Sequence, residues 1–188
     1  MVKEPELEYI SWREIHRVLY NLSQRIIREY GRDYFDIIIA VAKGGLIPAR
    51  ILSDLIDIEE IGIIGVKFYK GVSESMAKPV LTHPLTTSVS GKSALIVDDV
   101  VDSGRTLQLV IDELYRHGAS EVTSLALYIK PWATTRPDYY YKETTKWVVF
   151  PWEIIETLKE LGCSLFKKID IDDRELVENI KKKYCIGE

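Results

Sequence analysis

The run from Asp36 to Val41, which reads Asp-Ile-Ile-Ile-Ala-Val, constrains the fold more than any other segment of the sequence. Continuous β-branched residues are typical of a strand that is buried on both faces, and such strands occur in parallel sheets. Similar apolar runs follow at Ile61–Phe68, Ser93–Val97 and Glu121–Ile129. Because parallel strands are joined by long crossover connections, most often helices, these runs predict an α/β fold with a mainly parallel sheet.

Segments with helical spacing of apolar residues alternate with these strands. The longest, Trp12–Tyr30, follows Ser11, a good N-cap residue, and is followed by Gly31. This alternation of strands and helices predicts a doubly wound sheet. Further helices are expected at Pro48–Ile56, Leu107–His117, Pro151–Leu161 and Asp173–Tyr184, and short strands at Tyr139–Tyr141 and Trp147–Phe150.

Composition and charge exclude several classes of protein. The 188 residues are 46% hydrophobic and 29% charged, which excludes a disordered chain, and the net charge of −4 argues against a protein that coats nucleic acid. No apolar run is long enough to cross a bilayer, and the N-terminus carries acids where a signal peptide is apolar. We therefore expect a cytoplasmic protein. Cys163 and Cys185 form no metal or redox motif, so reduced thiols are the default expectation, with one disulfide left open.

The strongest candidate site is the segment Val97–Thr106, in which a buried strand ends in two acids, a third acid follows, and Ser-Gly-Arg-Thr opens a helix. In open α/β sheets, ligands bind beyond the carboxyl ends of the strands. The small residues at the helix N-terminus offer backbone N–H groups to a phosphate. Asp98 and Asp99 repel a phosphate but suit sugar hydroxyls or a hydrated Mg²⁺. One ligand that carries a ribose, a metal and a phosphate satisfies all of them, and the alternative is a capped helix with surface acids.

A second anion site is expected at Lys43–Gly45, which follows the strand Asp36–Val41. Two glycines allow the backbone to approach an anion closely, and the lysine supplies a countercharge. The alternative is an ordinary strand-to-helix turn. Residues Tyr69–Lys92 show no sustained periodicity and an excess of lysine, which favours a flap over the ligand, with a surface hairpin as the alternative.

These motifs resemble those of the type I phosphoribosyltransferases. The segment Val97–Thr106 is similar to their signature for phosphoribosyl pyrophosphate (PRPP), and Ala42–Pro48 to the pyrophosphate loop of the xanthine-guanine enzymes. Tyr9–Trp12 resembles the N-terminus of those enzymes, and Lys130-Pro131 with Trp147–Glu153 their purine-binding hood. The resemblance covers about residues 7–160. It implies the type I phosphoribosyltransferase fold, in which residues 1–165 form one domain with a hood at about 130–155, and 166–188 form a tail.

The resemblance also implies roles for individual residues. Asp102 is the expected catalytic residue, Mg²⁺ is the expected cofactor with Asp99 and Glu153 as its ligands, and the peptide bond between Ala42 and Lys43 is expected to be cis. Purine contacts are expected from Asp102, Lys130, Trp147 and Val148. PRPP contacts are expected from Lys43, Gly44, Gly45, Asp98, Asp99, Val100, Val101, Asp102, Ser103, Gly104, Arg105 and Thr106.

The expected reaction joins PRPP to a 6-oxopurine (guanine, hypoxanthine or xanthine) and releases pyrophosphate. Lys130 only donates hydrogen bonds, so it favours a 6-oxo group over the amino group of adenine, although a lone lysine there also fits a solvated strand end. Trp147 fits either base stacking or a core aromatic. The alternatives are a phosphoribosyltransferase for adenine or orotate, and a PRPP-binding regulator without turnover. A homo-oligomer, either a dimer or a tetramer, is expected, with no nucleic-acid or membrane partner.

Overall fold

The computed structural model describes residues 5–69 and 78–185. The chain divides into two compact units, each described here by itself. The sheet unit comprises residues 18–144, and the terminal unit comprises residues 1–17 and 145–188. The sequence-based boundary between residues 165 and 166 falls inside the terminal unit.

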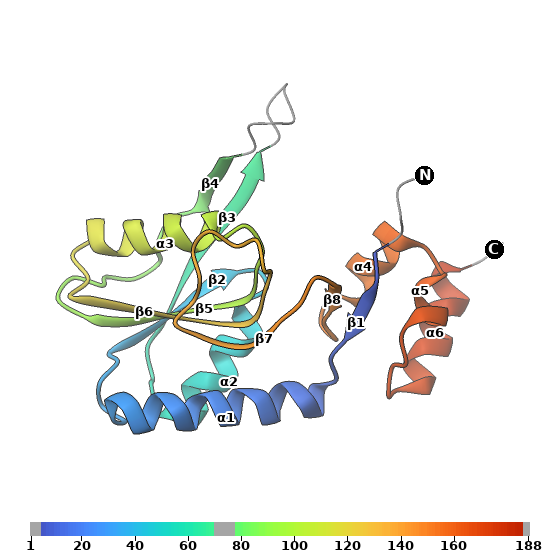
Figure 1. Ribbon diagram of the computed structural model, residues 1–188, viewed down its shortest axis with the longest axis horizontal. Coiled ribbons are helices and arrows are strands. Elements are labelled where there is room, and N and C mark those ends of the chain that lie inside the picture. The colour runs from blue at the N-terminus through green and yellow to red at the C-terminus, as the bar shows by residue number, and fades with distance from the viewer. Residues whose placement is uncertain (1–4, 70–77, 186–188) are drawn as a thin grey trace. The chain divides into compact units, whose positions relative to one another are not determined.

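The sheet unit is built on six strands in the order β4-β3-β2-β5-β6-β7 (Figure 1). All neighbouring pairs are parallel except β3 and β4. The chain runs outward from β2 to β3 and β4, then returns to β5 and runs outward on the other side, so the strand order reverses between β2 and β5. The strands are β2 (Ile37–Ala42), β3 (Ile61–Tyr69), β4 (Lys78–His83), β5 (Ser93–Val101), β6 (Glu121–Ile129) and β7 (Tyr139–Glu143).

Helices cover both faces of this sheet, as the doubly wound prediction requires (Figure 1). Helix α3 (Arg105–Arg116) packs on one face against β4, β5 and β6, and α2 (Leu46–Ile56) packs against β2, β3 and β5. Helix α1 (Trp12–Tyr30) contributes residues 18–30 to this unit, and they lie on the same face as α2. Successive residues of a strand point to opposite faces, and in β2 both faces are apolar: Ile37 and Ile39 join the core cluster under α3, while Ile38 is fully buried outside that cluster.

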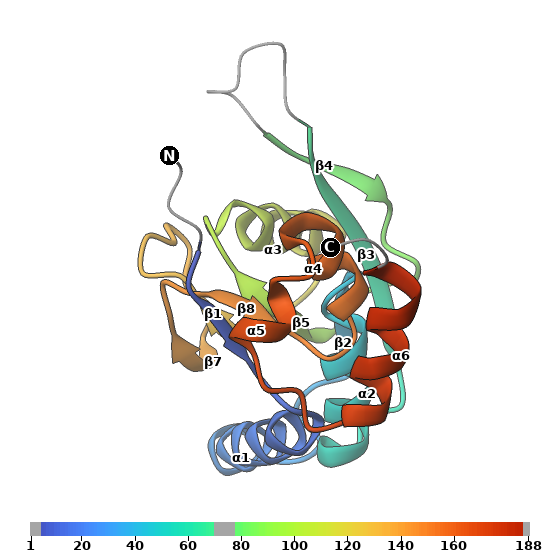
Figure 2. The same cartoon turned by 90° about the vertical axis from the view of Figure 1, so that its right-hand side faces the viewer.

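The terminal unit has a small parallel pair of strands, β1 (Leu7–Tyr9) and β8 (Trp147–Val149), followed by three helices (Figure 2). These are α4 (Ile154–Leu161), α5 (Leu165–Lys168) and α6 (Arg174–Tyr184). Their apolar side chains form one cluster, and Asp173 caps α6 by accepting a hydrogen bond from the Leu176 amide (2.9 Å). Cys163 and Cys185 form a disulfide across this unit, so the default expectation of reduced thiols was wrong.

The central strands and most helices were predicted, and the differences are local. Strand β5 continues to Val101 instead of ending at Val97, because Asp98, Val100 and Val101 pair with residues of β6. Helix α3 accordingly begins at Arg105, two residues earlier than predicted. The segment Tyr69–Lys92 contains β4, which pairs antiparallel with β3, and this pairing fits the expected flap as well as the hairpin alternative. The rest of the expected flap, residues 70–77, lies outside the described residues.

No helix within the described ranges combines the length and the apolar character that a membrane span requires.

Candidate active site

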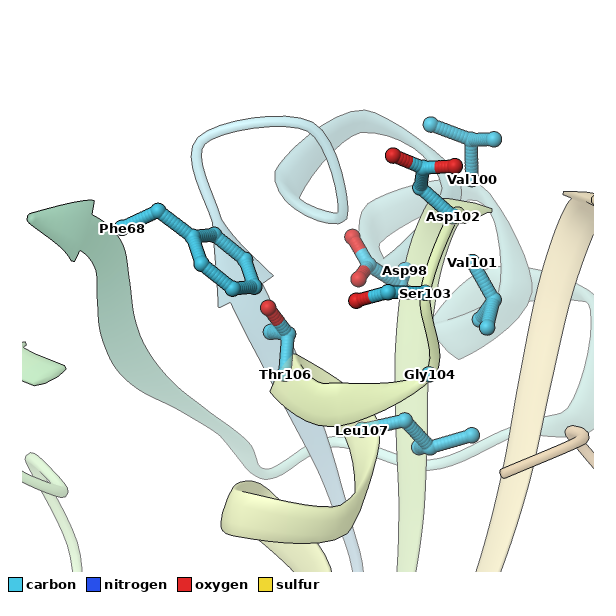
Figure 3. A pocket seen from close by; sticks show the side chains of 9 residues that line it. All are labelled: Phe68, Asp98, Val100, Val101, Asp102, Ser103, Gly104, Thr106 and Leu107. Atoms are coloured by element: carbon cyan, nitrogen blue, oxygen red, sulfur yellow. The ribbon is translucent and has the colours of Figure 1, made fainter. Parts of the chain in front are cut away.

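The end of β5 and the start of α3 surround a cavity of about 260 Å³ (Figure 3). The side-chain oxygens of Asp98, Ser103 and Thr106 face this hollow, and the ring of Phe68 from β3 lies across from them. The cavity lies at the carboxyl ends of the parallel strands, where ligands bind in open α/β sheets. It is lined by Phe68, Asp98, Val100, Val101, Asp102, Ser103, Gly104, Thr106 and Leu107.

The turn Ser103–Thr106 has the backbone geometry of an anion site. Gly104 is the N-cap of α3 and has a φ of 82°, which L residues with side chains rarely adopt. A Cβ on Gly104 would lie 2.5 Å from the backbone nitrogen of Thr135, so neighbouring backbone also excludes a side chain there. The N-terminal N–H groups of α3 and the helix dipole favour a bound phosphate at this turn.

Two carboxyl groups lie side by side at the end of β5. Asp98 accepts a hydrogen bond from the Asp99 amide (3.0 Å), and Asp99 accepts one from the Val100 amide (2.7 Å). Burial raises the pKa of the Asp98 carboxyl well above its usual range, and the neighbouring Asp99 carboxylate raises it further. A cation or a pair of hydroxyl donors at this position would relieve the repulsion between the two groups.

The loop after β2 packs directly against these carboxyl groups. A Cβ on Gly44 would lie 2.0 Å from Oδ2 of Asp99, and one on Gly45 would lie 2.2 Å from the carbonyl oxygen of Val97. Only glycine allows this approach of backbone to strand end. The peptide bond between Ala42 and Lys43 is cis, as expected from the resemblance. The structure therefore brings the two sequence-predicted anion segments together, at the point where the strand order reverses.

The third acid, Asp102, has a partner that sequence reasoning missed. Trp132 donates a hydrogen bond from Nε1 to Oδ1 of Asp102 (2.7 Å), and Nζ of Lys130 lies 5.8 Å from the centre of the Trp132 ring. Lys130 directly follows β6, and its amide donates to the carbonyl of Val101 (2.9 Å). The available clue in the sequence was the position of Trp132, two residues after Lys130.

The remaining predicted site residues belong to the terminal unit. Trp147 is the first residue of β8 and is 40% exposed, whereas Val148 is buried beside it. Glu153 is the residue before α4, and its Oε1 accepts a long hydrogen bond from the Phe150 amide (3.5 Å).

Few side chains in the described part of the chain are suited to hold a metal ion. Among residues 5–69 and 78–185, no group of three or more His, Cys, Asp or Glu side chains is arranged to hold a metal ion. The pair Asp98 and Asp99 is nevertheless suitable for Mg²⁺, which usually keeps several waters and binds through one or two carboxylates together with substrate phosphates.

Comparisons with known proteins agree with this geometry. A family model described as a phosphoribosyl transferase domain matches residues 8–155. The xanthine-guanine phosphoribosyltransferase of Gluconobacter oxydans is 32% identical over 146 residues, which cover 77% of this chain and 83% of that protein. The crystal structure of a purine phosphoribosyltransferase from Pyrococcus horikoshii is 43% identical, with a TM-score of 0.69 over 78% of this chain and 94% of that one.

A second solved structure with the same TM-score of 0.69, a Neisseria gonorrhoeae protein with bound ppGpp, is 26% identical and covers 85% of this chain and 97% of that chain. The family model spans the glycine loop after β2, the acids at the end of β5 and the N-terminus of α3, which together form the candidate site. The chain therefore belongs to the phosphoribosyl transferase domain family.

Proposed function

We propose that this protein transfers a phosphoribosyl group from PRPP to a 6-oxopurine base in purine salvage, giving a purine nucleotide and pyrophosphate. The observation that carries this proposal is the close packing of Gly44 against the Asp99 carboxylate, beside the N-terminus of α3. Two anion sites with a pair of acids between them match the 5′-phosphate, ribose and pyrophosphate of one PRPP molecule. The relatives named above, which act on purines by name, support the same reaction.

Each part of PRPP has a proposed partner in the sheet unit. The 5′-phosphate binds the backbone N–H groups and hydroxyls of the turn Ser103–Thr106. The ribose hydroxyls donate to Asp98 and Asp99. The pyrophosphate lies against the loop Lys43–Gly45, where the lysine offsets part of its charge.

We assign Mg²⁺ to Asp99, together with the substrate's own oxygens. When bound, the ion supplies positive charge that stabilises the leaving pyrophosphate. Asp99 is the more buried of the two acids, with 8% of its surface exposed, and it lies next to the glycine loop. A second ion held through Glu153 stays a proposal that rests on the resemblance alone.

The transfer forms a bond between N9 of the purine and C1′ of the ribose, while the bond from C1′ to the pyrophosphate oxygen breaks and its electron pair leaves with pyrophosphate. The ribose ring passes through an oxocarbenium-like state, as in glycoside chemistry. The reacting purine is the neutral tautomer that carries its imidazole proton on N7, and it loses that proton as the bond forms. The Asp102 carboxylate, in the turn after β5, accepts the proton. The products are the nucleotide and pyrophosphate, with the proton on the Asp102 carboxylate.

From the resemblance alone, we propose that Lys130 of the sheet unit and Trp147 and Val148 of the terminal unit select the base. The Lys130 ammonium donates to a 6-oxo group, which guanine, hypoxanthine and xanthine all carry. Stacking on Trp147 adds affinity for any purine, and the backbone of Val148 bonds the edge of the base. We also propose that the protein works in the cytoplasm, because a multiply charged substrate such as PRPP does not cross a bilayer unaided. A homo-oligomer, a dimer or a tetramer, is proposed from the resemblance.

The test is direct turnover. The protein is incubated with PRPP, Mg²⁺ and each of guanine, hypoxanthine, xanthine, adenine and orotate, and nucleotide formation is followed by chromatography. We expect nucleotide with at least one 6-oxopurine and little with adenine or orotate. Preference for adenine or orotate would reassign the base. Binding of PRPP without any nucleotide would indicate a regulatory protein.

A further inference from the structure

We propose that Trp132 is a positioning residue that holds Asp102 and Lys130 at the spacing needed to read one edge of the purine. The inference rests on the proposed function, since it concerns how these two residues meet the base. It adds to that function a side chain whose role follows from its contacts within the sheet unit.

The hydrogen bond between Trp132 and Asp102 fixes the orientation of the carboxylate. An indole N–H only donates, so the 2.7 Å contact makes Oδ1 of Asp102 the acceptor. Hydrogen bonds to an ionised carboxylate are shorter and stronger than those between neutral groups. With Oδ1 engaged, the second oxygen, Oδ2, is the one directed to a proton on the base.

The same indole ring also contacts the second residue that meets the purine. Nζ of Lys130 lies 5.8 Å from the centre of the Trp132 ring, within the range of a cation–π interaction. On a 6-oxopurine, N7 and O6 are neighbours on one edge of the base. Trp132 therefore contacts both the group that exchanges a proton at N7 and the group that donates to O6.

The segment that carries Trp132 is hydrogen-bonded to the turn Ser103–Thr106, the proposed site of the 5′-phosphate. The amide and the hydroxyl of Thr134 both donate to the carbonyl of Ser103 (3.0 and 2.9 Å), and the Thr135 hydroxyl donates to Gln108 (3.1 Å). The backbone of Thr135 also lies close against Gly104. The Trp132 side chain is exposed, and an exposed side chain on a mobile backbone would sample many positions. These contacts fix the backbone from which Trp132 extends.

Two substitutions separate the two contacts of the indole. Trp132→Phe keeps an aromatic ring for Lys130 but removes the N–H donor, so we expect kcat to fall about 10- to 100-fold with the KM for PRPP unchanged. The preference for 6-oxopurines over adenine is expected to persist. Trp132→Leu removes both contacts, and we expect the same loss in kcat together with weaker discrimination between guanine and adenine.

A double-mutant cycle and a control in the same segment test whether the effect acts through Asp102. In the Asp102→Asn background, Trp132→Phe should lower kcat by less than about twofold more, because its partner has already changed. The control, Arg136→Ala, removes the ion pair with Glu143 (2.8 Å) from the same segment without touching Asp102 or the contacts that hold Trp132, and its kcat should stay within about twofold of wild type. A Trp132→Phe variant with wild-type kcat, or with its full loss retained beside Asp102→Asn, would overturn the inference.

A measurement without turnover keeps this inference separate from the proposed function. The four tryptophans give four indole N–H resonances in ¹⁵N-labelled protein, and the Trp132→Phe spectrum identifies the one from Trp132. Asp102→Asn should move that resonance more than the other three. If wild type forms no nucleotide with any purine, the proposed function fails, yet the spectrum still decides this contact: a moved resonance supports it and an unmoved one overturns it.

Discussion

Replacing Gly44 by alanine should separate catalysis from stability at this site. The new methyl carbon would lie 2.0 Å from Oδ2 of Asp99, where ordinary contacts begin at 3.4 Å, so the carboxylate has to retreat by about 1.4 Å. The φ of Gly44 lies outside the left-handed region, so its backbone accepts alanine. The retreat weakens the hydrogen bond from the Val100 amide to Asp99 (2.7 Å), and such a bond contributes roughly 1 kcal/mol.

The functional cost is much larger, because a 1 Å misplacement in an active site lowers rates by about 100-fold. We therefore expect kcat/KM for PRPP to fall by about that factor in steady-state assays, while the midpoint of thermal unfolding falls by only about 2–4 °C. The matched control is Gly31→Ala, whose φ of 90° disfavours alanine by about 1–2 kcal/mol with no atom within 4 Å of the new methyl. That variant should lose stability and keep its kcat/KM. Wild-type kinetics in Gly44→Ala, or an equal kinetic loss in Gly31→Ala, would refute the reasoning.

Three further predictions follow from the same geometry and from the terminal unit. Asp102→Asn should lower kcat by about 10²- to 10⁴-fold in steady-state assays, with PRPP affinity by calorimetry close to normal. Lys130→Ala should reduce discrimination between guanine and adenine, whereas Trp147→Ala should raise the KM of both bases together; the reverse pattern would exchange their roles. Reducing the disulfide between Cys163 and Cys185, which are 22 residues apart, should lower the free energy of unfolding by about 3 kcal/mol, and a denaturant curve unchanged by dithiothreitol would contradict this.

The central strands were predictable because their pattern reflects burial alone. The run Asp36–Val41 lies in the middle of the sheet and is covered on both faces, so every position in it is apolar after the first. Strand β4 gave no such pattern, because it lies at the sheet edge and its residues Lys78–His83 are exposed or half-buried. Strand β1 is only three residues long and depends on its pairing with β8, which no local pattern reveals.

In the candidate site, sequence reasoning found the groups that carry charge and missed the one that orients them. Asp98, Asp99 and Asp102 stand out because three acids at a strand end have no use in a core. Trp132 does not stand out, since an aromatic residue in a loop has many structural explanations. Its role depends on a contact across 30 residues of sequence, from the end of β6 back to the turn after β5. The adjacency of these two strands, which creates the contact, is a property of the whole sheet.

The order of the strands also explains why two short motifs far apart in the sequence meet at one ligand. Strands β2 and β5 are neighbours, but the chain builds β3 and β4 between them and returns, so the connections after β2 and after β5 leave in opposite directions. Because these two connections diverge, they leave the carboxyl ends of β2 and β5 uncovered, and a ligand can bind there. Gly44 and Asp99 lie on the two sides of this opening, and their contact is as close as a glycine allows. A parallel sheet with β2 at its edge would keep both motifs intact and separate them, so the site depends on where the sheet reverses as much as on the motifs themselves.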